Sequence, residues 1–122
     1  AIDDMGESPQ RVAERLYDYA GVVDDILLDL SGGLGKPFDS AKSHDYLKAI
    51  ADKGYNDGHN DLGLGIAGGL GPDSLHLVEP LIADFPNLNI DAENGLRNER
   101  DELDEEKTLS YLSSAFRLFL KQ

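Results

Sequence analysis

The sequence predicts an α/β protein with a parallel sheet. Short apolar segments alternate along the chain with segments whose apolar residues recur at helical spacing. The apolar segments are nearly continuous, as in parallel strands that are covered on both faces. Glycine-rich turns follow two of them directly, which is typical of the loops at the carboxyl ends of strands in α/β proteins. We therefore expect one helix followed by three parallel strand–helix units, which together form part of a (β/α) barrel.

Composition limits the classes of protein that this chain could represent. Its 122 residues suffice for one domain, so we expect residues 1–122 to form a single partial barrel domain. No apolar run approaches the ~20 residues of a membrane span. The chain has no cysteine for a disulfide or a thiolate metal site, which fits a cytoplasmic protein. The 24 acidic and 11 basic residues give a net charge of −13, and without clustered cations we expect neither a nucleic-acid nor a membrane partner.

The first helix is predicted to begin after Ser8, a favourable N-cap, with Pro9 in its first turn. Helical spacing continues to about Ala20, and Gly21 is a plausible C-cap. The apolar residues that predict this helix are Val12, Ala13, Leu16, Tyr17 and Tyr19. The first strand is predicted over residues 22–28.

The second unit is predicted as a helix over residues 40–53, a loop over residues 54–61 and a strand over residues 62–67. The helix residues that we expect to face inward are Ala41, Tyr46, Leu47 and Ile50. The loop superficially resembles a calcium loop, but its oxygen ligands do not alternate and no glutamate closes it. The histidines also lack ligand spacing, so we expect no metal site.

The third unit is predicted to contain an interrupted helix. This helix should begin at Pro72 and be kinked or divided at Pro80. We expect a third strand over residues 88–92 and a terminal helix over residues 105–120. The apolar face of the terminal helix consists of Leu109, Leu112, Ala115, Phe116, Phe119 and Leu120. This face is predicted to pack in the core or against another subunit.

Two of the predicted strand ends carry residues suited to ligand binding. Asp29 closes the first apolar run, and the glycine-rich turn Ser-Gly-Gly-Leu-Gly-Lys follows at residues 31–36. A second glycine-rich turn lies within residues 64–72. Backbone N–H groups of such turns, together with a following helix, bind phosphate. The pattern predicts a phosphate-binding enzyme, although the carboxylate could instead stabilise a turn and the glycines could simply form tight turns.

In this order the motifs resemble the C-terminal part of phosphoribosylanthranilate isomerase. Residues 26–29 (Ile-Leu-Leu-Asp) are similar to the strand end of that family, and residues 32–39 (Gly-Gly-Leu-Gly-Lys-Pro-Phe-Asp) to its mobile loop. Residues 66–72 are similar to its phosphate loop, and residues 91–97 occupy the place of its last strand end. The resemblance extends from about Ser8 to the C-terminus and implies barrel units six to eight, preceded by helix five.

The resemblance also implies roles for particular residues. Asp29 would be the general acid that protonates the furanose ring oxygen in the Amadori rearrangement of tryptophan biosynthesis. Gly68 and Gly69 would bind the phosphate through their backbone, and Asn94 and Gly95 would form a second phosphate-binding turn.

Further substrate contacts follow from the same resemblance. Gly33, Gly35 and Lys36 would belong to the mobile loop, and Asp91 would contact the substrate. Lys36 could instead be a solvated surface residue. The implied ligand is a phosphorylated small molecule, and we expect no cofactor.

Three differences from the family bear on catalysis. The family's general base is a cysteine on the first barrel strand, which this chain does not contain. Glu93 replaces a serine near the phosphate, and Arg97 replaces a glutamate. Two hypotheses follow: an isomerase completed by the missing N-terminal strands, or a non-catalytic half-barrel that binds a phosphorylated small molecule or only assembles with itself or a partner. Either predicts a homo-oligomer or association with the missing barrel half.

Overall fold

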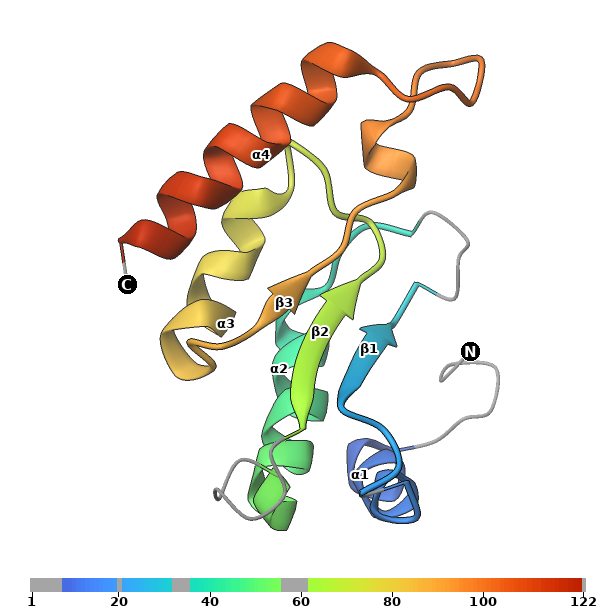
Figure 1. The fold of residues 1–122 in the computed structure, drawn as a ribbon, viewed down its shortest axis with the longest axis vertical. Helices are drawn as coiled ribbons and strands as arrows, with labels where there is room; N and C mark the ends of the chain where they lie inside the picture. The colour runs from blue at the N-terminus through green and yellow to red at the C-terminus, as the bar shows by residue number, and fades with distance from the viewer. Residues whose placement is uncertain (1–7, 20, 32–35, 56–61, 122) are drawn as a thin grey trace.

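The computed structural model describes residues 8–19, 21–31, 36–55 and 62–121, and it confirms the predicted α/β class (Figure 1). The helices and strands are α1 (Pro9–Tyr17), β1 (Asp25–Asp29), α2 (Ser40–Ile50), β2 (Gly63–Ala67), α3 (Glu79–Asp84), β3 (Asn89–Ile90) and α4 (Glu105–Leu120). A π-helical turn, η1 (Ala51–Tyr55), and two 3₁₀ helices, η2 (Leu75–Val78) and η3 (Asn94–Leu96), complete the elements. Among the described helices, none has the length and apolar character needed to cross a membrane.

The three strands form one parallel sheet in the order β1-β2-β3. Asp29 is in register with Ala67, and Ile66 is in register with Ile90. The N–H of Asp91 donates to the carbonyl oxygen of Ile66 at 2.9 Å and extends the pairing one residue beyond β3. Because the strands run in the same direction, their carboxyl ends lie at the same edge of the sheet (Figure 1).

The helices that the structure describes cover only one face of this sheet. In Figure 1, α2 lies behind the strands and α3 lies beside β3, and no described helix lies in front of the sheet. Two neighbours in β1 show the consequence: Leu28 is 3% exposed, whereas Leu27 is 53% exposed. A Cβ at Gly65 would contact the side chains of Leu27 and Asn89, so these three positions share the uncovered face.

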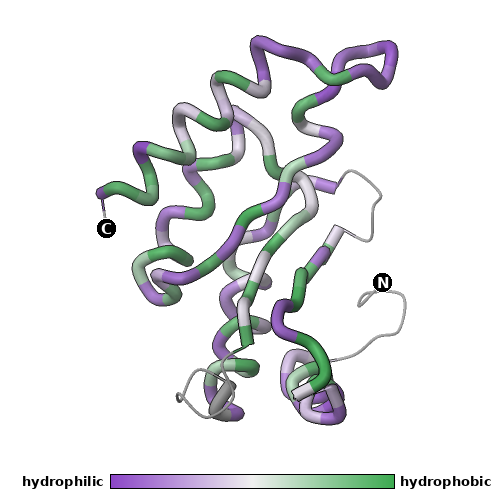
Figure 2. Tube along the Cα trace, in the orientation of Figure 1, coloured by the Kyte–Doolittle hydropathy of each residue, from purple (hydrophilic) through white to green (hydrophobic). Residues whose placement is uncertain are grey.

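The core lies between the sheet and the helices. Its most deeply buried apolar side chains are Leu47, Ile50, Ile66, Leu70, Val78, Leu81 and Ile82. Ser43 is also buried, and its hydroxyl donates to the carbonyl oxygen of Asp39 at 2.7 Å, which satisfies the polar atom. Of the four residues of α2 predicted to face inward, Ala41 is exposed and the prediction for it was wrong. Figure 2 shows how hydrophobic and hydrophilic residues alternate along the helices.

The first helix ends three residues earlier than predicted, and the first strand begins three residues later. Asp18 is the C-cap of α1 in place of Gly21. Gly21 has a φ of 80° in the turn that follows, where the N–H groups of Val22 and Val23 both donate to the carbonyl oxygen of Tyr19. Val22 therefore lies in a turn despite its preference for strands, Val23 forms only a single β-bridge, and the continuous strand begins at Asp25.

The third unit matches its prediction in part. Pro80 lies in the first turn of α3, directly after η2, where its missing N–H costs little. The predicted start at Pro72 was wrong, because helical structure begins at Leu75. Strand β3 has two residues instead of five. Helix α4 has the predicted bounds, with the N–H of Lys107 donating to Oδ1 of the N-cap Asp104 at 2.9 Å.

Leu28→Ala and Leu27→Ala form a matched test of the uncovered sheet face. We expect Leu28→Ala to lower the free energy of unfolding by about 2–4 kcal/mol, because it leaves a cavity in the core. Leu27→Ala should lower it by less than about 1 kcal/mol, because the side chain already contacts water. Urea unfolding of both variants measures the difference. Equal losses would mean that the face carrying Leu27 is covered in solution.

Candidate functional site

A cavity of about 350 Å³ lies at the carboxyl ends of the three strands. The loops that follow all three strands contribute to its wall. The lining residues are Asp29, Ser31, Lys36, Pro37, Ala67, Gly68, Gly69, Leu70, Asp91, Glu93, Asn94 and Gly95. Its volume falls in the lower part of the range of small-molecule sites, about 300–1,000 Å³.

Seven of the nine site residues predicted from the sequence line this one cavity. They are Asp29, Lys36, Gly68, Gly69, Asp91, Asn94 and Gly95. The other two, Gly33 and Gly35, lie outside the described residues. The parallel sheet therefore brings together residues that are more than sixty positions apart in the chain, such as Asp29 and Asn94.

Asp29 is the last residue of β1, and hydrogen bonds fix the position of its carboxylate. Its Oδ1 accepts one bond from the N–H of Ser31 at 2.9 Å and another from the Ser31 hydroxyl at 2.7 Å. This is the turn-stabilising arrangement that the sequence left open. The other oxygen, Oδ2, accepts no hydrogen bond from the residues that the structure describes. Sequence reasoning missed Ser31, although a hydroxyl residue two positions after an aspartate is a signal for such a turn.

Gly68 and Gly69 have φ values of 96° and 75°, which favour glycine. A Cβ on Gly68 would lie 2.6 Å from Oδ1 of Asp29 and 2.8 Å from the hydroxyl oxygen of Ser31. A Cβ on Gly69 would overlap the carbonyl oxygen of Lys36. Glycine is therefore required at both positions by conformation and by the close approach of the loop after β1.

The third part of the wall is η3, which directly follows β3. A Cβ at Gly95 would overlap the carbonyl oxygen of Leu70, so η3 packs directly against the backbone of the loop after β2. The backbone N–H groups of Asn94 and Gly95 donate to no described residue, and the same is true of Gly68 and Gly69. These four N–H groups therefore have no hydrogen-bond partner among the described residues.

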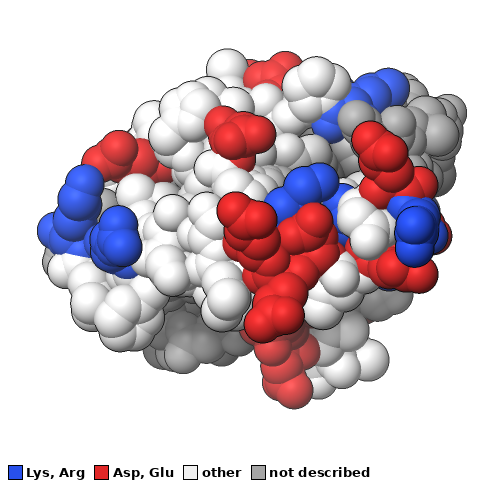
Figure 3. All heavy atoms as spheres, turned by 90° about the horizontal axis from the view of Figure 1, so that it is seen from above, with Lys and Arg blue, Asp and Glu red and all other residues white. Residues whose placement is uncertain are grey.

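The cavity carries more negative than positive charge. Asp29, Asp91 and Glu93 contribute carboxylates, whereas Lys36 is the one cationic residue among the described lining residues. Figure 3 looks down on this end of the molecule and shows acidic and basic groups side by side. An Oε1 atom of Glu93 lies 3.7 Å from the guanidinium of Arg97, which partly offsets this carboxylate.

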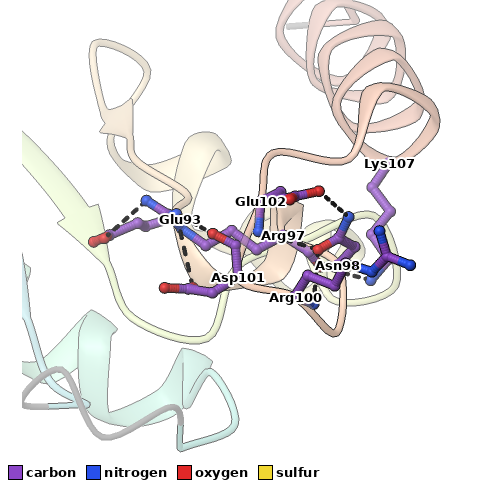
Figure 4. A network of polar contacts seen from close by, with 7 residues as sticks. All are labelled: Glu93, Arg97, Asn98, Arg100, Asp101, Glu102 and Lys107. Atoms are coloured by element: carbon purple, nitrogen blue, oxygen red, sulfur yellow. Dashed lines mark hydrogen bonds and ion pairs between the residues drawn. The ribbon is translucent and has the colours of Figure 1, made fainter.

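A polar network holds the loop between η3 and α4 (Figure 4). Arg97 donates to the carbonyl oxygen of Asp101 at 2.8 Å, and its own carbonyl oxygen accepts a bond from Lys107 at 2.8 Å. The side-chain oxygen of Asn98 accepts from two backbone N–H groups of the same loop, at 2.9 and 3.0 Å. Each exposed contact contributes little to stability. Together they place the guanidinium of Arg97 beside Glu93.

Tyr111 of α4 was not singled out by sequence reasoning. It is 5% exposed, and its buried hydroxyl has no hydrogen-bond partner within the described part of the chain. Burial and, to a smaller extent, the charge of Asp91 raise the pKa of Tyr111 to about 12. No local sequence pattern indicates this environment, because it depends on the packing of α4 against the rest of the molecule.

The remaining features of this region do not compete with the cavity at the strand ends. A larger hollow of about 650 Å³ shares Pro37, Gly69, Leu70 and Gly95 with it, but contains neither Asp29 nor Asp91. Within the ranges that the structure describes, no group of three or more histidine or acidic residues is arranged to hold a metal ion.

Comparison with known proteins identifies no relative of this chain. No family model, no curated protein and no solved structure matches it. The candidate site therefore rests on the residues and their geometry.

Tyr111→Phe tests the buried hydroxyl. Between pH 10 and 12 the unfolded chain loses the tyrosine proton, while the folded chain retains it because its pKa is about 12. The unfolded state then binds fewer protons, so this group contributes stability below pH 10 that is lost as pH rises through 12. As pH rises from 10 to 12, the free energy of unfolding of the wild type should fall by roughly 2 kcal/mol more than that of Tyr111→Phe. Urea unfolding at several pH values measures the difference, and parallel curves for the two proteins would contradict the assignment.

Proposed function

We propose that this chain carries the phosphate-binding and general-acid part of an active site like that of phosphoribosylanthranilate isomerase. One observation supports the proposal most directly: the loops after three successive parallel strands bring Asp29 and two glycine turns to one cavity. Ligands of α/β proteins bind at this edge of the sheet.

The anion would be held by local donors, because the chain as a whole is strongly acidic. The four N–H groups without a described partner come from two turns that line the cavity, at residues 68–69 and 94–95. Successive N–H groups in such turns form concave anion sites. Lys36 adds a positive charge to the same wall, and Arg97 offsets the carboxylate of Glu93.

The acid would be Asp29, acting through Oδ2. The bonds from Ser31 hold Oδ1 and leave Oδ2 available to a ligand in the cavity. In its protonated form, Asp29 would transfer its proton to the furanose ring oxygen while the bond from this oxygen to the anomeric carbon breaks. A base from outside this chain would then remove the proton from the neighbouring carbon, and the enol formed would give the ketone. The base and the rest of the wall would come from further strand–helix units.

A second candidate function is a half-barrel that binds a phosphorylated ligand without catalysis. The turn at Asp29 favours it, because that carboxylate already has a structural role through Ser31. The exposed carboxylates of Asp91 and Glu93 also favour it, since they add repulsion that a phosphate must overcome. The two candidates share the anion site and differ in the role of Asp29.

Lys36→Gln tests the anion site that both candidates share. We expect inorganic phosphate, ribose 5-phosphate and an anthranilate-bearing analogue each to raise the melting temperature of the 122-residue chain. Lys36→Gln should weaken phosphate binding about tenfold, because it removes a charge-assisted contact. The matched control is Lys48→Gln, since Lys48 is exposed on α2 and pairs with Asp52 at 3.0 Å. Absence of any shift, or an equal loss in the control, would sink the proposal.

Asp29→Asn separates catalysis from binding. The asparagine side-chain oxygen still accepts both bonds from Ser31, so the turn should persist, but the amide does not act as an acid. In the complete protein that supplies the base, kcat/KM should fall more than tenfold with phosphate binding retained. Activity equal to that of the wild type would remove Asp29 from the mechanism. Phosphate binding without isomerisation by the complete wild type would favour the non-catalytic candidate.

A further inference from the structure

Helix α4 exposes most of the apolar face that the sequence predicted for it. Four large apolar residues on this helix, which we call the α4 seam, are 57–69% exposed. They are Leu109, Leu112, Phe116 and Leu120. The helix is instead held to the molecule through Tyr111 and Leu118, which are 5% and 8% exposed. The apolar seam is thus additional to the contacts that anchor the helix.

The α4 seam has the spacing of a helix-packing surface. Its residues follow one another at intervals of three, four and four, so they lie along one side of the helix. Ser113 is exposed close to the middle of the seam, and its small side chain permits close approach of a second helix. Contiguous exposed apolar residues of this kind mark interaction sites.

The two ends of α4 carry opposite charges. Glu105 and Glu106 are exposed in the first turn, and Arg117 and Lys121 are exposed at the other end. None of the four forms an ion pair with another residue that the structure describes. A second α4 running antiparallel would place each acidic end beside a basic end. A parallel one would place like charges together.

We propose that the α4 seam binds a second copy of this chain, with the two α4 helices antiparallel about a two-fold axis near Ser113. The surface is self-complementary, because the apolar residues are distributed evenly about its middle and the charges have opposite signs at its ends. In this arrangement Leu112 of one copy meets Phe116 of the other. Glu106 lies near Lys121 of the second copy.

The size of the seam indicates a weak dimer. Four partly exposed side chains on each copy would bury roughly 800–1,000 Å² in total, below the ~1,200 Å² of a standard interface. The net charge of −13 on each copy also opposes association. We expect a dissociation constant of roughly 10–100 μM. Added salt should strengthen the dimer, because it screens the repulsion between the two acidic chains.

Sedimentation equilibrium of the full chain tests the proposal. From about 10 μM to about 1 mM, the mass should rise from 13.3 kDa towards twice that value. Phe116→Asp should keep the chain monomeric, because it places a charge at the centre of the contact in both copies. Val22→Asp is the matched control, since it adds the same charge at another apolar residue, 79% exposed and outside α4. Far-UV circular dichroism shows whether each variant is folded.

A charge exchange tests the antiparallel orientation. Glu106→Lys and Lys121→Glu should each weaken the dimer about three- to tenfold, and the double variant should restore it. The two single changes alter the net charge in opposite directions, so net charge cannot explain a loss in both. Failure of the double variant to restore binding would overturn the orientation.

Two other outcomes would overturn the proposal. The first is a chain that stays monomeric over the whole range. The second is a dimer that survives Phe116→Asp, and its loss in Val22→Asp would then assign the contact to the β1 side of the sheet. None of these results bears on phosphate binding, since no residue of the α4 seam lines the cavity at the strand ends.

Discussion

The close approach of glycine turns at the carboxyl edge of the parallel sheet is the constraint on which this structure depends. Gly68 packs against the carboxylate of Asp29 and the hydroxyl of Ser31, and Gly95 packs against the backbone of Leu70. A side chain at either glycine would push the neighbouring loop outward. Because strands β1, β2 and β3 end at this edge, the same contacts that close the fold also form the wall of the cavity. The proposed ligand binding would therefore be coupled to the stability of the fold at these positions.

Electrostatics sets the second condition on function. A chain with a net charge of −13 repels anions at long range, so a phosphate site needs donors within hydrogen-bond distance. For the proposed site, the two glycine-containing turns would provide N–H groups and Lys36 one positive charge. Arg97 pairs with Glu93 and partly offsets the negative charge of its carboxylate. Glu93 and Arg97, two residues that differ from the isomerase family that the sequence resembles, thus form an ion pair with each other. The same acidity makes any self-association through α4 dependent on salt.

Much of the fold and of the candidate site could be predicted because the signals are local. Helix α4 begins after a capping aspartate and ends where its apolar periodicity ends, so its bounds were predicted correctly. Seven residues predicted for the site line one cavity, because turns that follow neighbouring parallel strands meet at one edge of the sheet. The start of β1 was not predicted, because hydrogen bonds to the carbonyl oxygen of Tyr19 follow α1 at Val22 and Val23, and the continuous strand begins only at Asp25.

The sequence by itself determined the alternation of strands and helices, the division of the third helix near Pro80 and the apolar character of one side of α4. Each depends on periodicity, capping or ring geometry within a few residues. Only the tertiary structure decided that the hydroxyl of Tyr111 would be buried and that the α4 seam would remain exposed. These outcomes depend on which segments pack together, and packing partners are set by contacts between residues far apart in the chain.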